Sequence, residues 1–169
     1  MYTVGSGVVH PYYGPGIIIE IRQASLGSTM QPCYVIRTSS RNPTLFTIPA
    51  SLDEQREIRP VADLSFLRMC LLRLCEPPRE GQIEQDFAAR QRHMRQSLGS
   101  GSFEQIVSIV HKLYFLSSKH PLSMIDRRLL EKGEELLAGE LALASDTSVA
   151  EARREVERNL AKMPNAEEG

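Results

Sequence analysis

The chain has 169 residues and a mass of 19.0 kDa, with 41% hydrophobic and 24% charged side chains and a formal net charge of −1. These values are typical of one globular domain or two small ones, and they exclude collagen-like, disordered and histone-like chains. No signal peptide opens the sequence, and no apolar run approaches the length of a membrane span. Three cysteines, at positions 33, 70 and 75, cannot form a complete disulfide framework. We therefore expect a cytoplasmic protein with reduced thiols and no membrane partner.

The first sixty residues contain short apolar segments bounded by glycine and proline. They hold 5 of the 11 glycines and 6 of the 10 prolines, and their β-branched and aromatic runs have the length of strands. In the run at 44–48, Leu45 and Thr47 face one way and Phe46 and Ile48 the other. About five strands are expected, at residues 6–9, 16–22, 33–38, 44–48 and 57–59. This pattern predicts a small five-stranded β-barrel of the Tudor or SH3 kind over residues 1–61.

From residue 62 the spacing of apolar residues becomes helical. Leucines recur at helical intervals up to the prolines at 77 and 78, and Ser102 opens a capping-box sequence. About five helices are expected, over residues 62–75, 82–98, 102–120, 123–144 and from 148 onwards. The sequence therefore predicts an α+β protein of two domains, in which an all-α domain of residues 62–163 follows the barrel and residues 164–169 form a frayed tail.

Charge is distributed unevenly along the chain. Residues 68–128 carry ten basic and six acidic side chains, a net charge of +4, whereas residues 129–169 carry five basic and ten acidic ones, a net charge of −5. The basic stretch includes Arg90, Arg92 and Arg95 on one predicted helix and Arg127 and Arg128 at the start of another. This clustering indicates either a nucleic-acid surface or an ordinary solvated helical face.

The sequence contains no recognisable catalytic or metal-binding motif. It has no phosphate-binding loop ending in Gly-Lys, and its Gly5-Ser6-Gly7 precedes a strand instead of joining a strand to a helix. Its histidines, at 10, 93, 111 and 120, lack the spacing of zinc ligands. For His10 a structural hydrogen bond is expected. We therefore predict a protein that is not an enzyme and has no cofactor, metal or small-molecule substrate.

Several short motifs, in order along the chain, resemble those of the CarD/CdnL proteins. Residues 8–18 read VVHPYYGPGII, close to the family's opening pattern V-V-H/Y-P-x-H/Y-G-x-G-x-I. Further agreement comes from YVI at 34–36, IP at 48–49, IRPV at 58–61, LS at 122–123, RRLL at 127–130 and LLAGELA at 136–142. The resemblance covers both predicted domains, and the N-terminal one is also similar to the RNA polymerase-interacting domain of transcription-repair coupling factors.

This resemblance implies a transcription regulator that binds the RNA polymerase β subunit through the barrel. It also implies that the helical domain contacts promoter DNA at the upstream edge of the melted bubble and stabilises the open complex. The expected location is the cytoplasm, in association with the nucleoid. The polymerase-binding residues are then Ala24, Leu26 and Thr47 by correspondence, with Val35 and Arg37 on the strands expected to dock by edge addition.

On the DNA side, the family inserts a tryptophan into the minor groove. This chain has no Trp and carries Phe87 at that position, with Ala89 where a basic residue is expected. The expected DNA-binding residues are Phe87, Arg90, Arg92, Arg95, Arg127 and Arg128. From the sequence alone, Phe87 is about equally well explained as a core residue of its helix.

Two other functions stay open at this stage. The helical domain could bind a protein instead of DNA, which would make the chain an RNA polymerase- or peptide-binding adaptor. An enzyme with a site assembled from distant residues, without a motif, is the third class.

Overall fold

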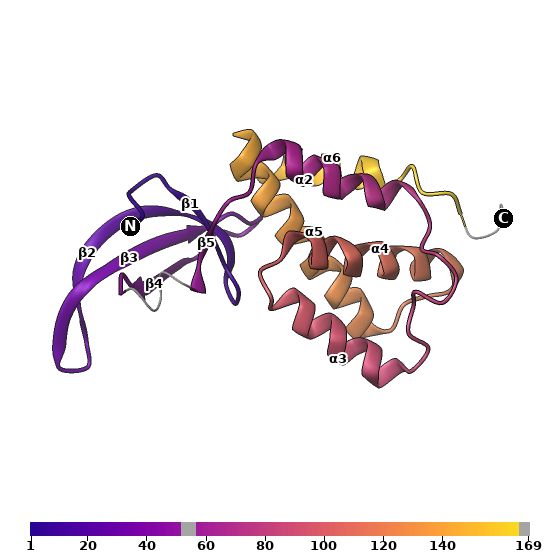
Figure 1. Cartoon of the computed structure of the whole chain (residues 1–169), viewed down its shortest axis with the longest axis horizontal. Coiled ribbons are helices and arrows are strands. Elements are labelled where there is room, and N and C mark those ends of the chain that lie inside the picture. The colour runs from indigo at the N-terminus through magenta and orange to yellow at the C-terminus, as the bar shows by residue number, and fades with distance from the viewer. Residues whose placement is uncertain (52–56, 166–169) are drawn as a thin grey trace.

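The computed structural model describes residues 1–51 and 57–165, and in it a β-sheet module is followed by a helical module (Figure 1). Of the predicted tail, residues 166–169 lie outside the described residues. The five strands pair antiparallel in the order β4-β3-β2-β1-β5. Their bounds are β1 Gly7–His10, β2 Gly14–Leu26, β3 Thr29–Thr38, β4 Leu45–Pro49 and β5 Arg59–Pro60. The predicted set of strands is confirmed.

The sheet is open, and a five-stranded module followed by helices agrees with the Tudor-like two-domain layout predicted from the sequence. Within residues 1–51 and 57–165, β4 pairs with β3 and β5 pairs with β1, so these two strands are the edges. Closure requires the edge strands to pair with each other. Here β5 has two residues and β4 has five, so a ladder between these two strands could be no more than two residues long. The sheet therefore keeps an edge on which further pairing is possible.

A small core and a tightly held turn give the sheet module its shape. Apolar side chains from four strands and from Ile58 meet on one face, and they are Val8, Ile18, Tyr34, Ile36, Ile48 and Ile58. The turn from β1 to β2 is held by His10, whose Nδ1 accepts hydrogen bonds from the backbone amides of Tyr12 at 3.0 Å and Tyr13 at 3.1 Å. The structural role expected for His10 is confirmed.

Five α-helices are described after the sheet, and side-chain caps mark the start of four of them. The caps are Asp86, Ser102, Ser123 and Ser148, each accepting a bond from a backbone amide three residues on. The elements are α2 Leu64–Leu71, which continues as a 3₁₀ turn η1 Leu72–Cys75, α3 Phe87–Leu98, α4 Phe103–Lys119, α5 Met124–Ser145 and α6 Val149–Leu160. The helix predicted at 82–98 thus begins only at Phe87, because the cap at Asp86 ends the preceding turn.

Helix α5 is the central element and connects the two modules. It packs against α4, α6 and α3, and its last turns also lie against β2 (Figure 1). At that contact Ser39 Oγ donates a 2.7 Å hydrogen bond to the carbonyl oxygen of Gly139. A Cβ at position 139 would collide with the Ser39 carbonyl oxygen, so only glycine permits this approach. The helix backbone is therefore seated directly on the sheet module.

Candidate functional site

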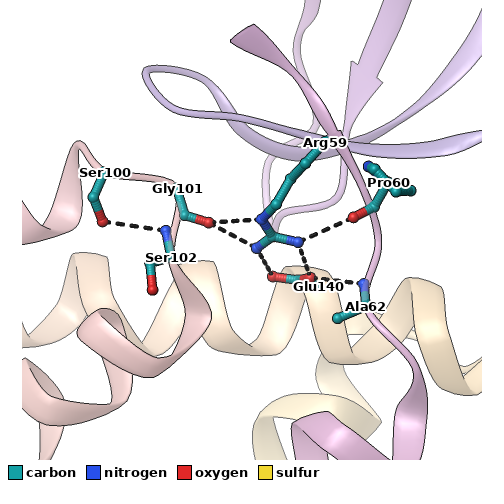
Figure 2. Close-up of polar contacts among 7 residues, drawn as sticks. All are labelled: Arg59, Pro60, Ala62, Ser100, Gly101, Ser102 and Glu140. Carbon is teal, nitrogen blue, oxygen red and sulfur yellow. Dashed lines mark hydrogen bonds and ion pairs between the residues drawn. The ribbon is translucent and has the colours of Figure 1, made fainter. Parts of the chain in front are cut away.

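The junction between the modules is built on one ion pair, in which half-exposed Arg59 reaches the buried carboxylate of Glu140 (Figure 2). Arg59 comes from β5 and Glu140 from α5, and the two join through Nη1 to Oε1 at 2.6 Å and Nη2 to Oε2 at 2.8 Å. Nε and Nη2 of Arg59 also donate to the carbonyl oxygen of Gly101, and Nη1 donates to that of Pro60. The Ala62 amide donates to Glu140 Oε1 at 3.1 Å.

This Arg59–Glu140 cluster uses the full hydrogen-bonding capacity of the guanidinium. A guanidinium has five N–H donors in a planar fork, and here five donor contacts are made. The Glu140 side chain is 2% exposed, so its charge depends on Arg59 for compensation. The cluster ties together the sheet edge, the loop between α3 and α4, and the C-terminal third of α5. It therefore fixes any surface on the sheet relative to any surface on the helices.

The residues predicted to bind polymerase all lie on one face of the sheet. Antiparallel partners point their side chains to the same side, and alternate residues of a strand share a face. The register places Leu26 opposite Thr29, Glu20 opposite Val35 and Val35 opposite Thr47. The common face therefore carries Ala24, Leu26, Val35, Arg37 and Thr47.

These five residues differ in what they expose. Leu26 is 42% exposed, Arg37 and Thr47 are exposed, and Ala24 is half-buried. Val35 is only 4% exposed, so its side chain is not available for a partner. The expectation that the strand at 33–38 receives a partner strand is also corrected, because β3 is paired on both sides, with β2 and β4.

In the part of the chain that the structure describes, β4 has no strand on its side away from β3, and its backbone groups there are open to pairing. The Thr38 amide donates to the Thr44 carbonyl oxygen, so the bonded pairs of this ladder continue at Ile36–Phe46 and Tyr34–Ile48. The backbone N–H and C=O groups of Leu45 and Thr47 consequently face outward. Leu45 is 62% exposed beside them. Of the two described edges, β4 is the longer one, with five residues against two in β5.

The N-terminal ends of α3 and α5 are held together by a second buried ion pair. Arg90 Nη2 lies 3.1 Å from Asp126 Oδ2, with side chains 12% and 3% exposed. Gln91 Nε2 donates to the other carboxylate oxygen at 3.2 Å. Arg90 is thus bound internally, which corrects its expected role as a phosphate contact. Arg92 and Arg95 on α3 and Arg127 and Arg128 on α5 are exposed.

Phe87 lies on the surface at the first residue of α3. Its side chain is 49% exposed, so the explanation of Phe87 as a core residue is wrong. The guanidinium carbon of Arg90 lies 5.1 Å from the centre of the phenyl ring, which supports the ring from one side by a cation–π contact. Met124 and Ile125, which begin α5, are also exposed, at 69% and 39%. The arrangement is an apolar projection at two helix N-termini, beside exposed arginines.

Comparison with known proteins identifies the two modules. Residues 2–62 match the model of the CarD-like/TRCF RID domain, and residues 74–157 match that of the CarD C-terminal domain. The chain belongs to the CarD family. This CarD-family chain is also 27% identical over 143 residues to "Putative transcription factor YdeB" of Bacillus subtilis (strain 168), covering 83% of the chain and 90% of that relative.

Membership in the CarD family indicates a role in transcription and an interaction with RNA polymerase. Members of this family are not known as enzymes. Over residues 1–51 and 57–165, no helix is long and apolar enough to cross a membrane. In the same described ranges, no three His, Cys, Asp or Glu side chains are placed to hold a metal ion together. The predicted division of the chain at residues 61 and 62 falls between β5 and α2 and stays a prediction.

The Arg59–Glu140 cluster is the main feature that sequence reasoning missed. Both residues lie inside short motifs that carried the resemblance, IRPV and LLAGELA, but 81 positions separate them. Helical spacing does place Glu140 among buried leucines on α5, and a carboxylate in such a position requires a partner. That was the available signal, although it does not identify Arg59.

Replacing Arg59 with alanine should destabilise the fold strongly, because Glu140 would be left buried without compensation. We expect a loss of about 3–5 kcal/mol in the free energy of unfolding, measured by urea titration. Arg68→Ala is the matched control, since its 2.8 Å pair with Glu155 is exposed and should cost no more than about 1 kcal/mol. Equal losses in the two variants would contradict the importance assigned to the cluster.

Proposed function

We propose that this CarD-family chain docks on the RNA polymerase β subunit through the edge of β4 and stabilises the promoter open complex. Its DNA contacts would lie at the joined ends of α3 and α5, at the upstream edge of the bubble. The observation that carries the proposal is Phe87, an exposed aromatic ring held over Arg90 at a helix N-terminus beside free arginines. A ring in that position has the chemistry of a minor-groove wedge.

The open sheet supports the polymerase half of the proposal. An unpaired strand edge recruits an extended segment through main-chain hydrogen bonds, and this tolerates changes of side chain. The outward backbone groups of Leu45 and Thr47 supply such an edge. Side chains on the same face, Arg37 and Leu26, can then contribute contacts beside it. The absence of basic side chains at Ala24, Leu26 and Thr47 leaves the backbone ladder as the main source of affinity.

The helix ends support the DNA half. An apolar side chain inserted at a base step opens the minor groove, while cations nearby anchor the phosphates. Phe87 supplies the apolar ring, and Arg127 and Arg128 supply cations on the adjacent helix. The ion pair of Arg90 with Asp126 positions α3 and α5 side by side, so the wedge and the cations keep a constant separation. Arg92 and Arg95 are lesser candidates for phosphate contact.

The substitution Thr47→Glu tests the docking edge. A carboxylate at the centre of β4 would repel the carbonyl groups of an added strand. Binding to an isolated β-subunit lobe should therefore weaken by tenfold or more, and a tenfold change corresponds to about 1.4 kcal/mol of binding free energy. The circular dichroism should stay unchanged, because Thr47 is exposed. Thr147→Glu, which adds the same charge to the helical module, is the control. Undiminished binding by Thr47→Glu would count against this edge.

The wedge is tested at Phe87. Phenylalanine lacks the indole N–H that tryptophan can offer to a base edge, a difference of about 1 kcal/mol or several-fold in affinity. Phe87→Trp should therefore lengthen the lifetime of the open complex and Phe87→Ala should shorten it, with β-subunit binding unaffected. A fall of several degrees in melting temperature for Phe87→Ala, with an unchanged lifetime, would show that the ring serves stability instead.

Phosphate contact by Arg127 is tested through salt dependence. Each phosphate neutralised contributes about 0.9 to the slope of log affinity against log salt, so Arg127→Ala should lower the slope on a forked promoter duplex by about one unit. Arg158→Ala, an exposed arginine on α6, should leave the slope as it is. A different outcome is that the wild-type chain binds polymerase but does not bind the forked duplex. The helical module then binds a protein, and the chain is an RNA polymerase-binding adaptor.

A further inference from the structure

A groove runs along the junction between the sheet module and helices α5 and α6. It consists of three adjoining hollows of about 490, 480 and 480 Å³. The first two share Arg41 and Arg153, and the second and third share Asn42, Lys132 and Glu135. The loop from β3 to β4 therefore forms one wall over its whole length, and the two helices form the other. The groove includes no residue of β4 and not Phe87, and it meets the proposed DNA site only at Arg128.

The groove is more basic than the chain as a whole. Its lining includes the cations Arg41, Arg128, Lys132, Arg153 and Arg154, against the carboxylates Glu131, Glu135 and Glu157. Arg153 is already bound by Glu134 at 3.1 Å and by Glu157 at 3.4 Å. Among the residues that the structure describes, the other four cations form no ion pair. The unpaired charges of the lining are thus four cations and two carboxylates, Glu131 and Glu135. The lining is therefore net positive, in a chain whose net charge is −1.

An exposed aromatic residue stands at one end of this basic groove. Tyr12 is 79% exposed, and its ring packs edge-on against Tyr13 with centroids 4.9 Å apart. Tyr13 in turn stacks on Phe46 at 4.2 Å, with the ring planes inclined by 23°. The His10 side chain holds the backbone of this turn through two amides. Tyr12 is therefore an exposed ring on a turn whose backbone is already held in place.

We propose that this groove binds a single strand of DNA, with a base stacked on Tyr12 and the phosphates along Lys132, Arg41 and Arg128. A positively charged track with an aromatic stacking surface is the arrangement that binds single strands without sequence preference. Thr38, Ser40, Asn42 and Thr44 add hydrogen-bonding groups to the same wall. Paired bases in a duplex keep their faces covered, so the exposed ring of Tyr12 favours an unpaired strand.

This inference rests on the proposed function, because a melted promoter supplies the single strand. The groove is also continuous with that site along α5. Arg128 lines the groove, and its neighbour Arg127 belongs to the proposed fork contact. A strand leaving the fork at the N-terminal end of α5 would pass Arg128 and then Lys132, one helical turn further on, before it reaches the sheet module. The helix would thereby guide the strand from the wedge to the β-subunit side.

The test is fluorescence anisotropy of the full chain with a labelled oligothymidine of roughly 12 nucleotides, a length within the usual range of single-strand sites. Tyr12→Ala should weaken binding by about fivefold or more, since it removes base stacking, whereas Tyr12→Phe should bind like the wild type. Arg41→Ala should lower the salt slope by about 0.7, the value for one phosphate of a single strand. Arg22→Ala, an exposed arginine of the same sheet outside the groove, should not change it.

The outcomes separate this inference from the proposed function. Binding of oligothymidine that depends on Tyr12 and Arg41 supports the groove, even if Phe87→Ala leaves the open complex unchanged. Failure to bind oligothymidine, while a forked duplex still binds through Arg127, overturns the groove alone. Equal binding by Tyr12→Ala, or tighter binding of a matching duplex, shows a duplex track and overturns it as well. Tighter binding of oligouridine than of oligothymidine overturns the assignment to DNA.

Discussion

The arrangement of both modules depends on the charge of Glu140 being buried. A carboxylate at 2% exposure is tolerated only with a cation and further hydrogen bonds, and Arg59 supplies the cation from the other module. Separating the modules would remove Arg59 from Glu140, so its free-energy cost includes that of leaving this carboxylate without its cation. Because Gly101 and Ala62 join the same cluster, the α3–α4 loop and the linker are fixed with it. A single electrostatic requirement sets the relative position of sheet and helices.

A similar use of buried charge organises the helical module. Asp126 lies at the start of α5, where Ser123 caps the helix, and its carboxylate draws in Arg90 and Gln91 from α3. Removing one partner of such a pair is costly, because the other charge is then left buried without compensation. Here the pair aligns two helix N-termini and gives Phe87 a cation to rest on. Among the residues that the structure describes, the other arginines of these two helices form no ion pair and are exposed.

Local features of the fold could be predicted from the sequence, and long-range ones could not. Strand and helix positions follow from the period of the apolar residues, and Ser102, Ser123 and Ser148 mark helix starts through their own hydroxyl groups. The burial of Val35 depends on neighbours in space. The roles of Arg59 and Arg90 depend on partners 81 and 36 residues away, which no local pattern identifies.

The free edge of β4 has a consequence for the chain away from its partner. The five-residue strand carries no lysine, and Leu45 beside its outward backbone groups is exposed. Protective charges, bulges or covering segments are the usual means of keeping such an edge from pairing with other strands. A two-fold axis through β4 would join two copies into a continuous ten-stranded sheet, the simplest symmetric use of an antiparallel edge. Strand addition by the proposed partner and self-association through β4 would then compete for the same five residues.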